Sequence, residues 1–367
     1  MGLQVLSQET VNIRENHAKY GVGKGKADEL AQKAASLEAE CIIFDRDISP
    51  SQQRNWEELA GIPVIDRQEL IIQIFTSRAR TKEAELQAGL AQLIYALPRL
   101  RHKYVDLSRQ RGGRYGTRGS GETRLETDRR RVEQRIQLLE KELELLKRRR
   151  QVQRRQRERQ GAAVCVLVGY TNAGKSSLLN ALTGAGVFVE DKLFATLDST
   201  SRRLKLPGSS KGTYGSQCIL VDTVGFIRRL PHSLIKAFYS TLEEVSRADI
   251  ILNVLDASDP DISAHYNTTL SVLEELKAAD IHKITVLNKI DKVESAEKHV
   301  DSGAKPEAPA DFQSLEALLK LFPGSVPVSA LSGRGLSELC LRIENSLASL
   351  KKTQSQSYKR QAEGLPL

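Results

Sequence analysis

The stretch that decides the fold reads Gly169-Tyr-Thr-Asn-Ala-Gly-Lys-Ser-Ser177. It follows an apolar run, residues 162–168, that is typical of a buried strand, and it leads into apolar residues at helical spacing, 178–182. A strand, the spacing G-x-x-x-x-G-K-S and a helix predict a phosphate-binding loop, because backbone N–H groups and the helix N-terminus face the same anion. In such a loop Lys175 reaches the β- and γ-phosphates and Ser176 binds Mg²⁺.

Three further segments follow in the order that a guanine-nucleotide switch requires, each at the end of an apolar run (218–221, 284–287 and 326–328). A further apolar run, 250–255, lies between the first and the second of these and also predicts a buried strand. Asp222-Thr-Val-Gly225 supplies a carboxylate for Mg²⁺ and a backbone N–H for the γ-phosphate. Asn288-Lys-Ile-Asp291 places a carboxylate opposite the N1–H and 2-amino group of guanine, donors that adenine does not offer. Ser329-Ala-Leu331 has backbone N–H groups for the guanine O6. The four motifs predict an α/β P-loop GTPase domain that binds GTP and GDP and hydrolyses GTP.

The Mg²⁺-binding threonine of the first switch is expected before Asp222. Phe194-Ala-Thr-Leu-Asp198 contains the first candidate, Thr196, and Thr200 is its rival; a solvated threonine in a loop is the alternative. The predicted Mg²⁺ ligands are Ser176, Thr196 and Asp222, and the predicted catalytic groups are Lys175, Thr196 and Gly225. All predicted GTP contacts are Gly169, Tyr170, Thr171, Asn172, Ala173, Gly174, Lys175, Ser176, Ser177, Phe194, Thr196, Asp222, Gly225, Asn288, Lys289, Asp291, Ser329, Ala330 and Leu331.

Position 226 sets an expectation for the rate of hydrolysis. Ras-type GTPases have a water-orienting glutamine directly after this glycine, whereas this chain has Phe226. A phenyl ring cannot orient a water by hydrogen bonding, so intrinsic hydrolysis is expected to be slow and to depend on a group from a loop or a partner. Asn172 is a candidate ligand for a K⁺ ion near the β/γ bridge.

Composition limits the class of protein. The chain of 367 residues has room for two or three domains, and 40% of it is hydrophobic. No apolar run reaches the roughly 18 residues of a membrane span, and residues 1–16 lack a signal-peptide pattern. The four cysteines lie far apart, which predicts buried thiols instead of a disulfide or zinc framework. We therefore expect a cytoplasmic protein, and we expect it to be a monomer.

The positive charge is concentrated in one segment. Residues 101–160 carry 20 Lys and Arg against 9 Asp and Glu, a net +11, while the whole chain has a net charge of +9. Within this segment residues 109–121 hold five glycines, four arginines and no acid. Such a loop cannot bury a core, but it places guanidinium groups on phosphates and bases. Nucleic acid, above all RNA, is the favoured partner; a solvated linker is the alternative.

Two apolar stripes flank this loop. Before it, leucines recur at 86, 90, 93, 97 and 100; after it, apolar residues recur at 132, 136, 139, 143 and 146. This spacing predicts an antiparallel helical hairpin with a coiled-coil seam, and the alternative is that each stripe packs on a neighbouring domain. Pro98 is expected to kink or end the first helix, and Thr123 with Glu126 to cap the second.

The first 78 residues predict a small α/β unit. Short strands at 41–44 and 63–65 alternate with helices at 27–37, 51–60 and 68–80, which indicates a parallel sheet. Gly21-Val-Gly-Lys-Gly-Lys26 lacks P-loop spacing and is interpreted as a turn. The expected organisation is an N-terminal α/β subdomain at 1–78, the hairpin at 79–160, the GTPase domain at 161–349 and a basic polar tail at 350–367.

Several of these segments together resemble the HflX family of ribosome-associated GTPases. They are Gly23-Lys-Gly-Lys-Ala-Asp-Glu-Leu30, Ser49-Pro-Ser-Gln-Gln-Arg54, Ser108-Arg-Gln110, Gly119-Ser-Gly-Glu-Thr-Arg-Leu-Glu-Thr-Asp-Arg-Arg130 and Asp222-Thr-Val-Gly-Phe-Ile-Arg228. The resemblance spans residues 20–347. It implies binding to the large ribosomal subunit through the N-terminal domain and the hairpin, and GTP-dependent splitting or rescue of stalled ribosomes. It also implies rRNA contacts by Arg114, Tyr115, Arg118 and Arg124, beside Arg109 and Arg111 of the loop.

The chain departs from this family pattern at its ends. An opening strand cannot be placed in residues 3–13, and only a short polar tail follows residue 347, where many relatives have a further domain. Residues 293–312 are interpreted as a surface loop. Two other functions remain open: a GTPase of ribosome assembly or RNA modification, and an RNA clamp in which GTP is only structural.

Overall fold

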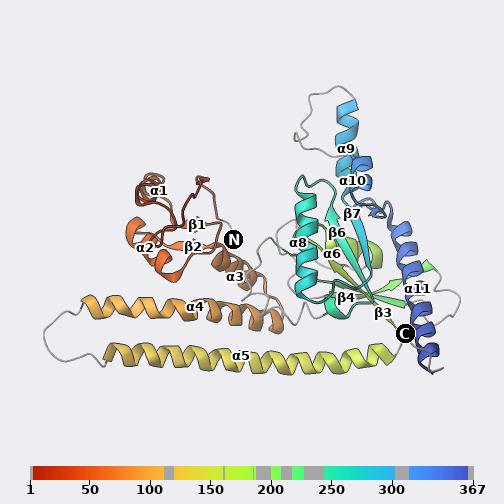
Figure 1. The fold of residues 1–367 in the computed structure, drawn as a ribbon, viewed down its shortest axis with the longest axis horizontal. Helices are drawn as coiled ribbons and strands as arrows, with labels where there is room; N and C mark the ends of the chain where they lie inside the picture. Colours follow the sequence, from red (N-terminus) through yellow and green to blue (C-terminus); the bar gives the residue numbers. More distant parts are fainter. Residues whose placement is uncertain are drawn as a thin grey trace. The chain divides into compact units, whose positions relative to one another are not determined.

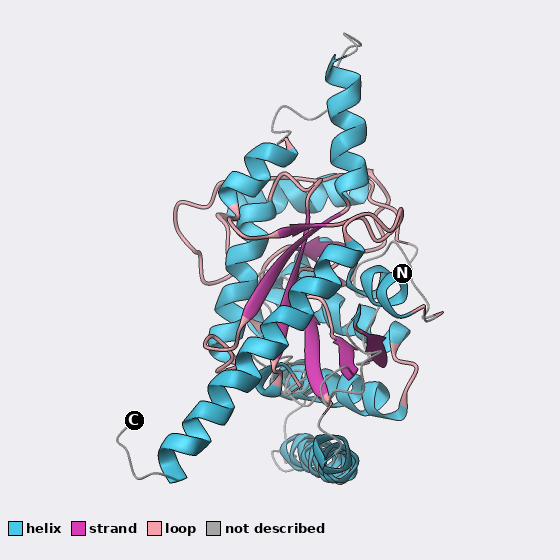
Figure 2. Cartoon of the chain, turned by 90° about the vertical axis from the view of Figure 1, so that its right-hand side faces the viewer, coloured by secondary structure: helices cyan, strands magenta, loops and turns pink. Residues whose placement is uncertain are grey.

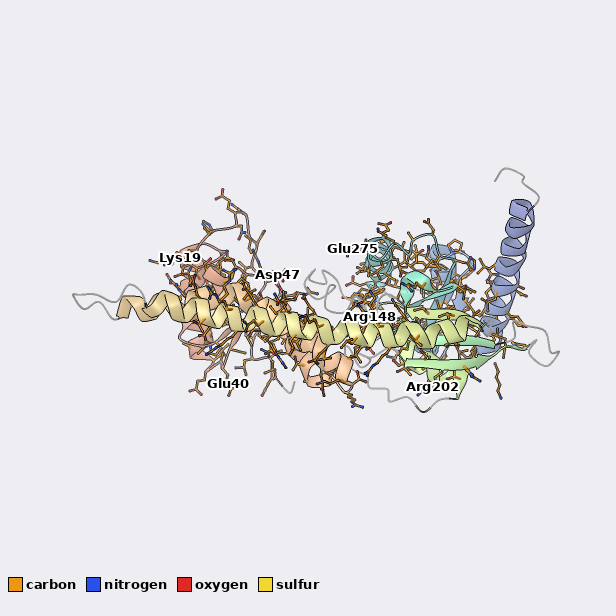
Figure 3. The ribbon with its side chains drawn as sticks, turned by 90° about the horizontal axis from the view of Figure 1, so that it is seen from below. Lys19, Glu40, Asp47, Arg148, Arg202 and Glu275 are labelled. Carbon is orange, nitrogen blue, oxygen red and sulfur yellow. The ribbon has the colours of Figure 1, made fainter. Side chains whose placement is uncertain are left out.

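The chain is described by a computed structural model that covers residues 3–110, 120–159, 162–184, 186, 200–207, 217–226, 244–301 and 314–362. The described residues fall into two compact units, one that ends at Leu146 and one that begins at Lys147. Exposed charged side chains project from the surface of both, for example Lys19, Glu40 and Asp47 from the first and Arg202 and Glu275 from the second (Figure 3).

The N-terminal part of the first unit is the predicted small α/β fold (Figure 1). Two short strands, β1 (Ile42–Phe44) and β2 (Val64–Asp66), pair in parallel, as the alternation of strands and helices predicted. Three helices accompany them: α1 (Lys24–Ser36), α2 (Pro50–Ala60) and α3 (Arg67–Arg78). Of the stretch 21–26, which was interpreted as a turn, only residues 21–23 lie outside the helix, because Lys24–Lys26 form the first residues of α1. Residues 3–13 form neither helix nor strand.

Trp56 organises the core of this fold. Its side chain is fully buried, its indole N–H donates to the Tyr20 carbonyl at 2.9 Å, and its ring packs against Phe44. The helix that carries it begins with a capping box, in which the Ser49 hydroxyl accepts from the Gln52 N–H and the Gln52 side chain accepts from the Ser49 N–H. The Ser49–Arg54 motif therefore has a structural role at a helix start.

The helical hairpin is confirmed by α4 (Lys82–Gln110) and α5 (Ser120–Arg159), which run antiparallel (Figure 1). Their seam is an apolar cluster made of residues from both predicted stripes, so the helices pack on each other instead of only on neighbours; its members are Leu86, Leu90, Leu93, Ile94, Ile136, Leu139, Leu143 and Leu146. Helix α4 also contacts α2 and α3. The stripe positions Leu97, Leu100 (on α4) and Val132 (on α5) are half-buried.

Three details of the hairpin prediction need correction. Pro98 lies inside α4 and does not end it. The second helix begins at Ser120, so Thr123 lies within the helix and is not its cap. Gln110 and Ser120 are helical, so the helices take in both ends of the predicted loop, and residues 111–119 lie outside the described residues.

Arg99 on α4 joins the hairpin to the α/β fold. Its guanidinium donates to the Asp66 carboxylate at 3.0 Å and to the Gln53 side chain at 2.8 Å, and it stacks 3.4 Å from the centre of the Tyr95 ring. The Tyr95 hydroxyl donates to Glu69 at 3.1 Å. Burial raises the pKa of Tyr95 well above its usual range, and the Asp66 charge raises it further. The tyrosine therefore stays neutral and donates.

The second unit is built on a six-stranded sheet with the order β4-β5-β3-β6-β7-β8. The strands are β3 (Ala163–Val168), β4 (Thr200–Lys205), β5 (Gln217–Asp222), β6 (Ile250–Asp256), β7 (Lys283–Asn288) and β8 (Val326–Pro327). All neighbours pair in parallel except β4, which is antiparallel to β5. The apolar runs predicted five of these strands; the edge strand β4 was missed because its sequence, Thr-Ser-Arg-Arg-Leu-Lys, is mostly polar.

Helices cover both faces of this sheet (Figure 2). One face packs on α6 (Lys175–Thr183) and α11 (Leu336–Ala362), the other on α8 (Ile262–Glu275), α9 (Ile290–Asp301) and α10 (Leu315–Leu321). Because side chains alternate along a strand, β3 sends Cys165 and Leu167 to the first face and Val166 and Val168 to the second. The sheet is doubly wound, and the unit has the α/β class that the sequence predicted.

One C-terminal expectation is wrong, and the last helix runs past a predicted boundary. Residues 293–301, interpreted as loop, belong to α9, whose Val293 is buried in the core. Helix α11 continues to Ala362, past the predicted domain boundary at 349.

The four cysteines are free thiols, as expected, but only Cys165 and Cys218 are buried. Among the described helices, none has both the length and the apolar character that crossing a membrane requires.

Candidate nucleotide site

The predicted phosphate loop connects the end of β3 to the start of α6, and two of its glycines are required by close contacts. Gly169 has a φ of 145°, and a Cβ there would lie 2.2 Å from the Val254 carbonyl oxygen. Gly174 has a φ of 85°, and a Cβ there would lie 2.3 Å from the Asn288 amide nitrogen. The loop therefore lies directly on β6 and on the guanine motif, which only glycine permits.

Lys175 is held by the loop that it belongs to. Its Nζ donates to the carbonyl oxygens of Gly169 at 3.2 Å and Tyr170 at 3.0 Å. An ammonium group has three donors, so one is left for a phosphate oxygen. Burial lowers the pKa of Lys175 to about 8, against the opposing influence of the Asp222 carboxylate. An anion bound in the loop would stabilise the positive charge of the Lys175 ammonium, which burial disfavours. The site therefore favours a phosphate ligand.

Ser176 and Asp222 form the predicted metal pair. The Ser176 hydroxyl donates to Asp222 Oδ2 at 2.5 Å, and both side chains are buried. The pair arises because β3 and β5 are adjacent parallel strands whose carboxyl ends meet at one edge. Hydroxyl and carboxylate oxygens suit Mg²⁺, which keeps waters and phosphate oxygens as its other ligands, so the residues fit the metal. The described residues contain no cluster of three or more His, Cys, Asp or Glu that holds a metal by itself.

The first-switch threonine is only partly placed. Phe194 and Thr196 lie outside the described residues. The rival candidate, Thr200, is the first residue of β4 and lies opposite Asp222 in the strand register.

The guanine motifs assemble at the ends of β7 and β8. Asn288 ties three loops together: its amide N–H donates to the Ala173 carbonyl at 2.9 Å, its amide oxygen accepts from the Ala330 N–H at 3.1 Å, and its carbonyl accepts from the Ala257 N–H at 2.8 Å. The Ser329 hydroxyl donates to Asp291 Oδ1 at 2.5 Å. This bond orients the carboxylate that the sequence predicts to bind guanine. Leu331 is 88% exposed and does not contribute to this network.

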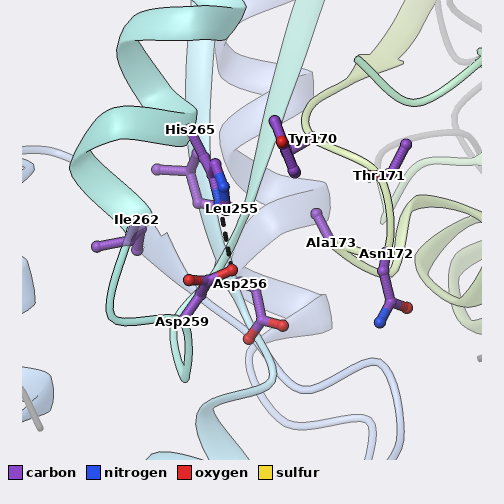
Figure 4. Close-up of a pocket in the computed structure, with 9 residues that line it drawn as sticks. All are labelled: Tyr170, Thr171, Asn172, Ala173, Leu255, Asp256, Asp259, Ile262 and His265. Atoms are coloured by element: carbon purple, nitrogen blue, oxygen red, sulfur yellow. Dashed lines mark ion pairs between the residues drawn. The ribbon is translucent and has the colours of Figure 1, made fainter. Parts of the chain in front are cut away.

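A pocket beside the phosphate loop contains residues that the sequence analysis missed (Figure 4). Asp256, at the end of β6, pairs with Lys289 at 2.7 Å. The His265 ring stacks on Tyr170 with ring centres 3.6 Å apart, and its Nδ1 lies 3.2 Å from Asp259. An acidic residue at the carboxyl end of a predicted strand is the signal that points to Asp256. Nothing in the linear sequence links His265 to Tyr170.

Position 226 is bound to the phosphate loop through its backbone. The Phe226 N–H donates to the Gly169 carbonyl at 3.0 Å, and the Thr171 N–H donates to the Phe226 carbonyl at 2.9 Å. The Phe226 side chain is 2% exposed and packs in the core with residues of β3 and α8. Gly225 lies directly against the loop, because a Cβ there would be 2.7 Å from Thr171 Cα and 3.1 Å from Lys175 Nζ.

The predicted RNA contacts are only partly described. Arg109 belongs to α4 and Arg124 to α5. Arg111, Arg114, Tyr115 and Arg118 lie outside the described residues.

A doubly wound sheet with a phosphate loop, a Ser/Asp metal pair and an Asn-Lys-x-Asp guanine motif defines a P-loop GTPase. Three family descriptions match consecutive parts of the chain: "GTP-binding GTPase N-terminal" at residues 1–76, "GTP-binding GTPase Middle Region" at 78–157 and "50S ribosome-binding GTPase" at 164–289. The chain is 40% identical to GTPase HflX of Escherichia coli over 95% of its length and 76% of that protein. It is 44% identical to GTPase HflX of Lacrimispora saccharolytica, with the same two coverages, 95% and 76%. The chain belongs to the HflX family of GTPases.

Coverage of other relatives is smaller. With GTPase HflX of Akkermansia muciniphila the identity is 46% over 80% of this chain and 67% of that protein. With the relatives from Caldanaerobacter subterraneus and Alkalihalophilus pseudofirmus the alignments span 65% and 62% of the relatives' length.

Proposed function

We propose that this chain is a ribosome-associated GTPase. In this proposal it binds the large ribosomal subunit through its N-terminal domain and helical hairpin, and it uses GTP binding and hydrolysis to dissociate or rescue stalled ribosomes. The observation that carries it is the combination of a guanine-nucleotide site with a rigid, basic hairpin in one chain of the HflX family.

The nucleotide part rests on the contacts of the second unit. Lys175 keeps one donor for the β- and γ-phosphates, Ser176 and Asp222 hold Mg²⁺, and Asp291 accepts from guanine. Mg²⁺, which GTPases of this class use, neutralises charge on the phosphates when it is bound. Thr196 is proposed as the switch threonine.

A monovalent cation is a further proposed cofactor. Asn172 lies in the phosphate loop with a φ of 63° and an exposed side chain, so its amide oxygen is available as a ligand for a cation. We propose that this amide binds K⁺ near the β/γ bridge. Hydrolysis that is equally fast in K⁺ and Na⁺ buffers would rule this out.

The ribosome part rests on the first unit. The apolar seam keeps α4 and α5 together, and Arg99 fixes α4 to the α/β fold, so the hairpin is a rigid support for the Gly/Arg segment between the helices. We propose that this segment, with Arg109, Arg111, Arg114, Tyr115, Arg118 and Arg124, contacts rRNA. The proposed division is 1–78, 79–160, 161–349 and 350–367, in a monomeric cytoplasmic protein.

Sedimentation of intact ribosomes with the purified chain and a non-hydrolysable GTP analogue tests this function. Free subunits are expected with the wild type but not with Lys175→Ala, because the variant lacks the phosphate contact. Lys320→Ala is a matched control, since Lys320 is an exposed lysine that pairs with Glu316 on the same helix.

The RNA contact needs its own comparison. The double variant Arg114→Gln, Arg118→Gln is expected to weaken binding to the ribosome. The control, Arg202→Gln with Arg203→Gln, removes the same charge from exposed positions of β4 and is expected to leave ribosome binding unchanged. If ribosomes stay intact while the chain still binds large subunits, a role in ribosome assembly or RNA modification replaces dissociation.

A further inference from the structure

The side chain at position 226 does not reach the γ-phosphate side of the loop. Phe226 is held by two backbone hydrogen bonds to the phosphate loop, and its ring is buried among Val166, Val168 and Val221. These backbone hydrogen bonds therefore fix the orientation in which the side chain of residue 226 points into the core. The group that orients the attacking water must come from another position.

Thr171 lies against Gly225 and beside Lys175. A Cβ on Gly225 would lie 2.8 Å from the Thr171 methyl carbon, Cγ2, and 3.1 Å from Lys175 Nζ, so the threonine side chain and the lysine ammonium both adjoin Gly225. Gly225 and Lys175 are the two groups that meet the γ-phosphate. The Thr171 and Asn172 side chains leave the loop in opposite directions (Figure 4).

The Thr171 hydroxyl is buried without a partner. The residue is 6% exposed, and its Oγ1 makes no hydrogen bond with any of the residues that the structure describes. A buried hydroxyl without a partner costs free energy, and this hydroxyl belongs to the phosphate loop, where a group that arrives with the ligand can become its partner. A threonine hydroxyl both donates and accepts, and a water molecule matches it on both counts.

We infer that Thr171 is a positioning residue for the attacking water and takes over the role that glutamine has in Ras-type GTPases. The water oxygen forms a bond to the γ-phosphorus while the bond from that phosphorus to the β–γ bridging oxygen breaks. GDP leaves with the electron pair, and one water proton passes to a γ-phosphate oxygen, so the second product is dihydrogen phosphate. Thr171 keeps its own proton and only orients the water. This inference rests on the proposed GTP hydrolysis.

Three variants separate the hydroxyl from the shape of the side chain. Thr171→Val keeps the β-branched shape without the hydroxyl, Thr171→Ala removes both, and Thr171→Ser keeps the hydroxyl. Single-turnover hydrolysis of GTP is measured for each with and without ribosomes, together with the affinity for a fluorescent GTP analogue. Thr171→Val and Thr171→Ala lose one hydrogen bond to the water, so their rate of GTP hydrolysis is expected to fall about tenfold while their GTP affinity stays within about twofold of wild type. Thr171→Ser is expected to retain most of the hydrolysis rate.

The outcomes are distinct. Hydrolysis by Thr171→Val at the wild-type rate overturns the inference and leaves the proposed function intact. Equal losses of rate and GTP affinity in all three variants assign Thr171 a structural role and overturn it as well. Absence of hydrolysis by the wild type in both conditions overturns the proposed function itself. If Thr171→Val does not fold, the comparison of Ala with Ser decides.

Discussion

Replacing Arg99 with methionine is expected to destabilise the N-terminal unit strongly. Arg99 and Asp66 form an ion pair of 3.0 Å in which the side chains are 19% and 1% exposed. Removing one partner of a buried pair leaves an uncompensated charge and costs about 3–5 kcal/mol. Methionine keeps an unbranched apolar stem over the Tyr95 ring, so the loss reports mainly on the charge and its hydrogen bonds.

The assay follows from the composition. The chain has one tryptophan, and Trp56 is fully buried in the core of this unit, so its fluorescence reports the unfolding of this unit. With a denaturant dependence of about 2 kcal/mol per molar urea, the midpoint is expected to fall by about 1.5–2.5 M.

Two further variants make the reasoning refutable. Arg129→Met removes the same side chain from an exposed pair with Glu133, at 47% and 41% exposure, and is expected to cost less than about 1 kcal/mol. Asp66→Asn retains the N-cap bond to Glu69, which is 2.8 Å long, while it removes the charge. Added to Arg99→Met it is therefore expected to restore stability. A cost for Arg99→Met no larger than that for Arg129→Met, or no restoration by Asp66→Asn, would refute the argument.

Three other predictions concern the nucleotide site. Asp291→Asn is expected to lower GTP affinity by about a hundredfold or more, because two charge-assisted bonds to guanine are lost, and to raise xanthine nucleotide affinity, measured by competition. GTP binding is expected to weaken above pH 8. The pKa of Lys175 is about 8 in the free protein, and the negative charge of the bound phosphate raises it. Above pH 8, binding therefore takes up a proton, and the Kd for GTP rises by up to about tenfold per pH unit. Gly225→Ala is expected to weaken GTP binding more than GDP binding, in titrations of both. Its Cβ would lie 2.7 Å from Thr171 Cα and so displace the backbone N–H predicted to meet the γ-phosphate, which GDP lacks.

Each of these has a clear contrary result. Unchanged preference for guanine in Asp291→Asn contradicts the role of the carboxylate that Ser329 orients. A Kd that is flat between pH 7 and 9, or calorimetry without proton uptake at pH 8.5, contradicts the lysine prediction. Equal effects of Gly225→Ala on GTP and GDP contradict the placement of the γ-phosphate beside Gly225.

The sequence by itself determined the class of fold and most of the nucleotide site. Phosphate loops and strand-end turns depend on local backbone geometry, so Gly169, Lys175, Asp222 and Asp291 were recognisable from their spacing, and the structure places Ser176 against Asp222 and Ser329 against Asp291. The repeat of apolar residues likewise predicted the seam of α4 and α5, because a helical period brings them to one face.

Only the tertiary structure decided which side chains reach the site and which do not. The Phe226 side chain is buried in the core, Asp256 pairs with Lys289, and His265 stacks on Tyr170. These contacts join segments that lie far apart in the chain. It also paired the polar strand β4 with β5, whose hydrogen bonds use the backbone and leave little trace in side-chain pattern. Such contacts depend on the packing of the whole sheet, so local sequence does not show which of these residues meet.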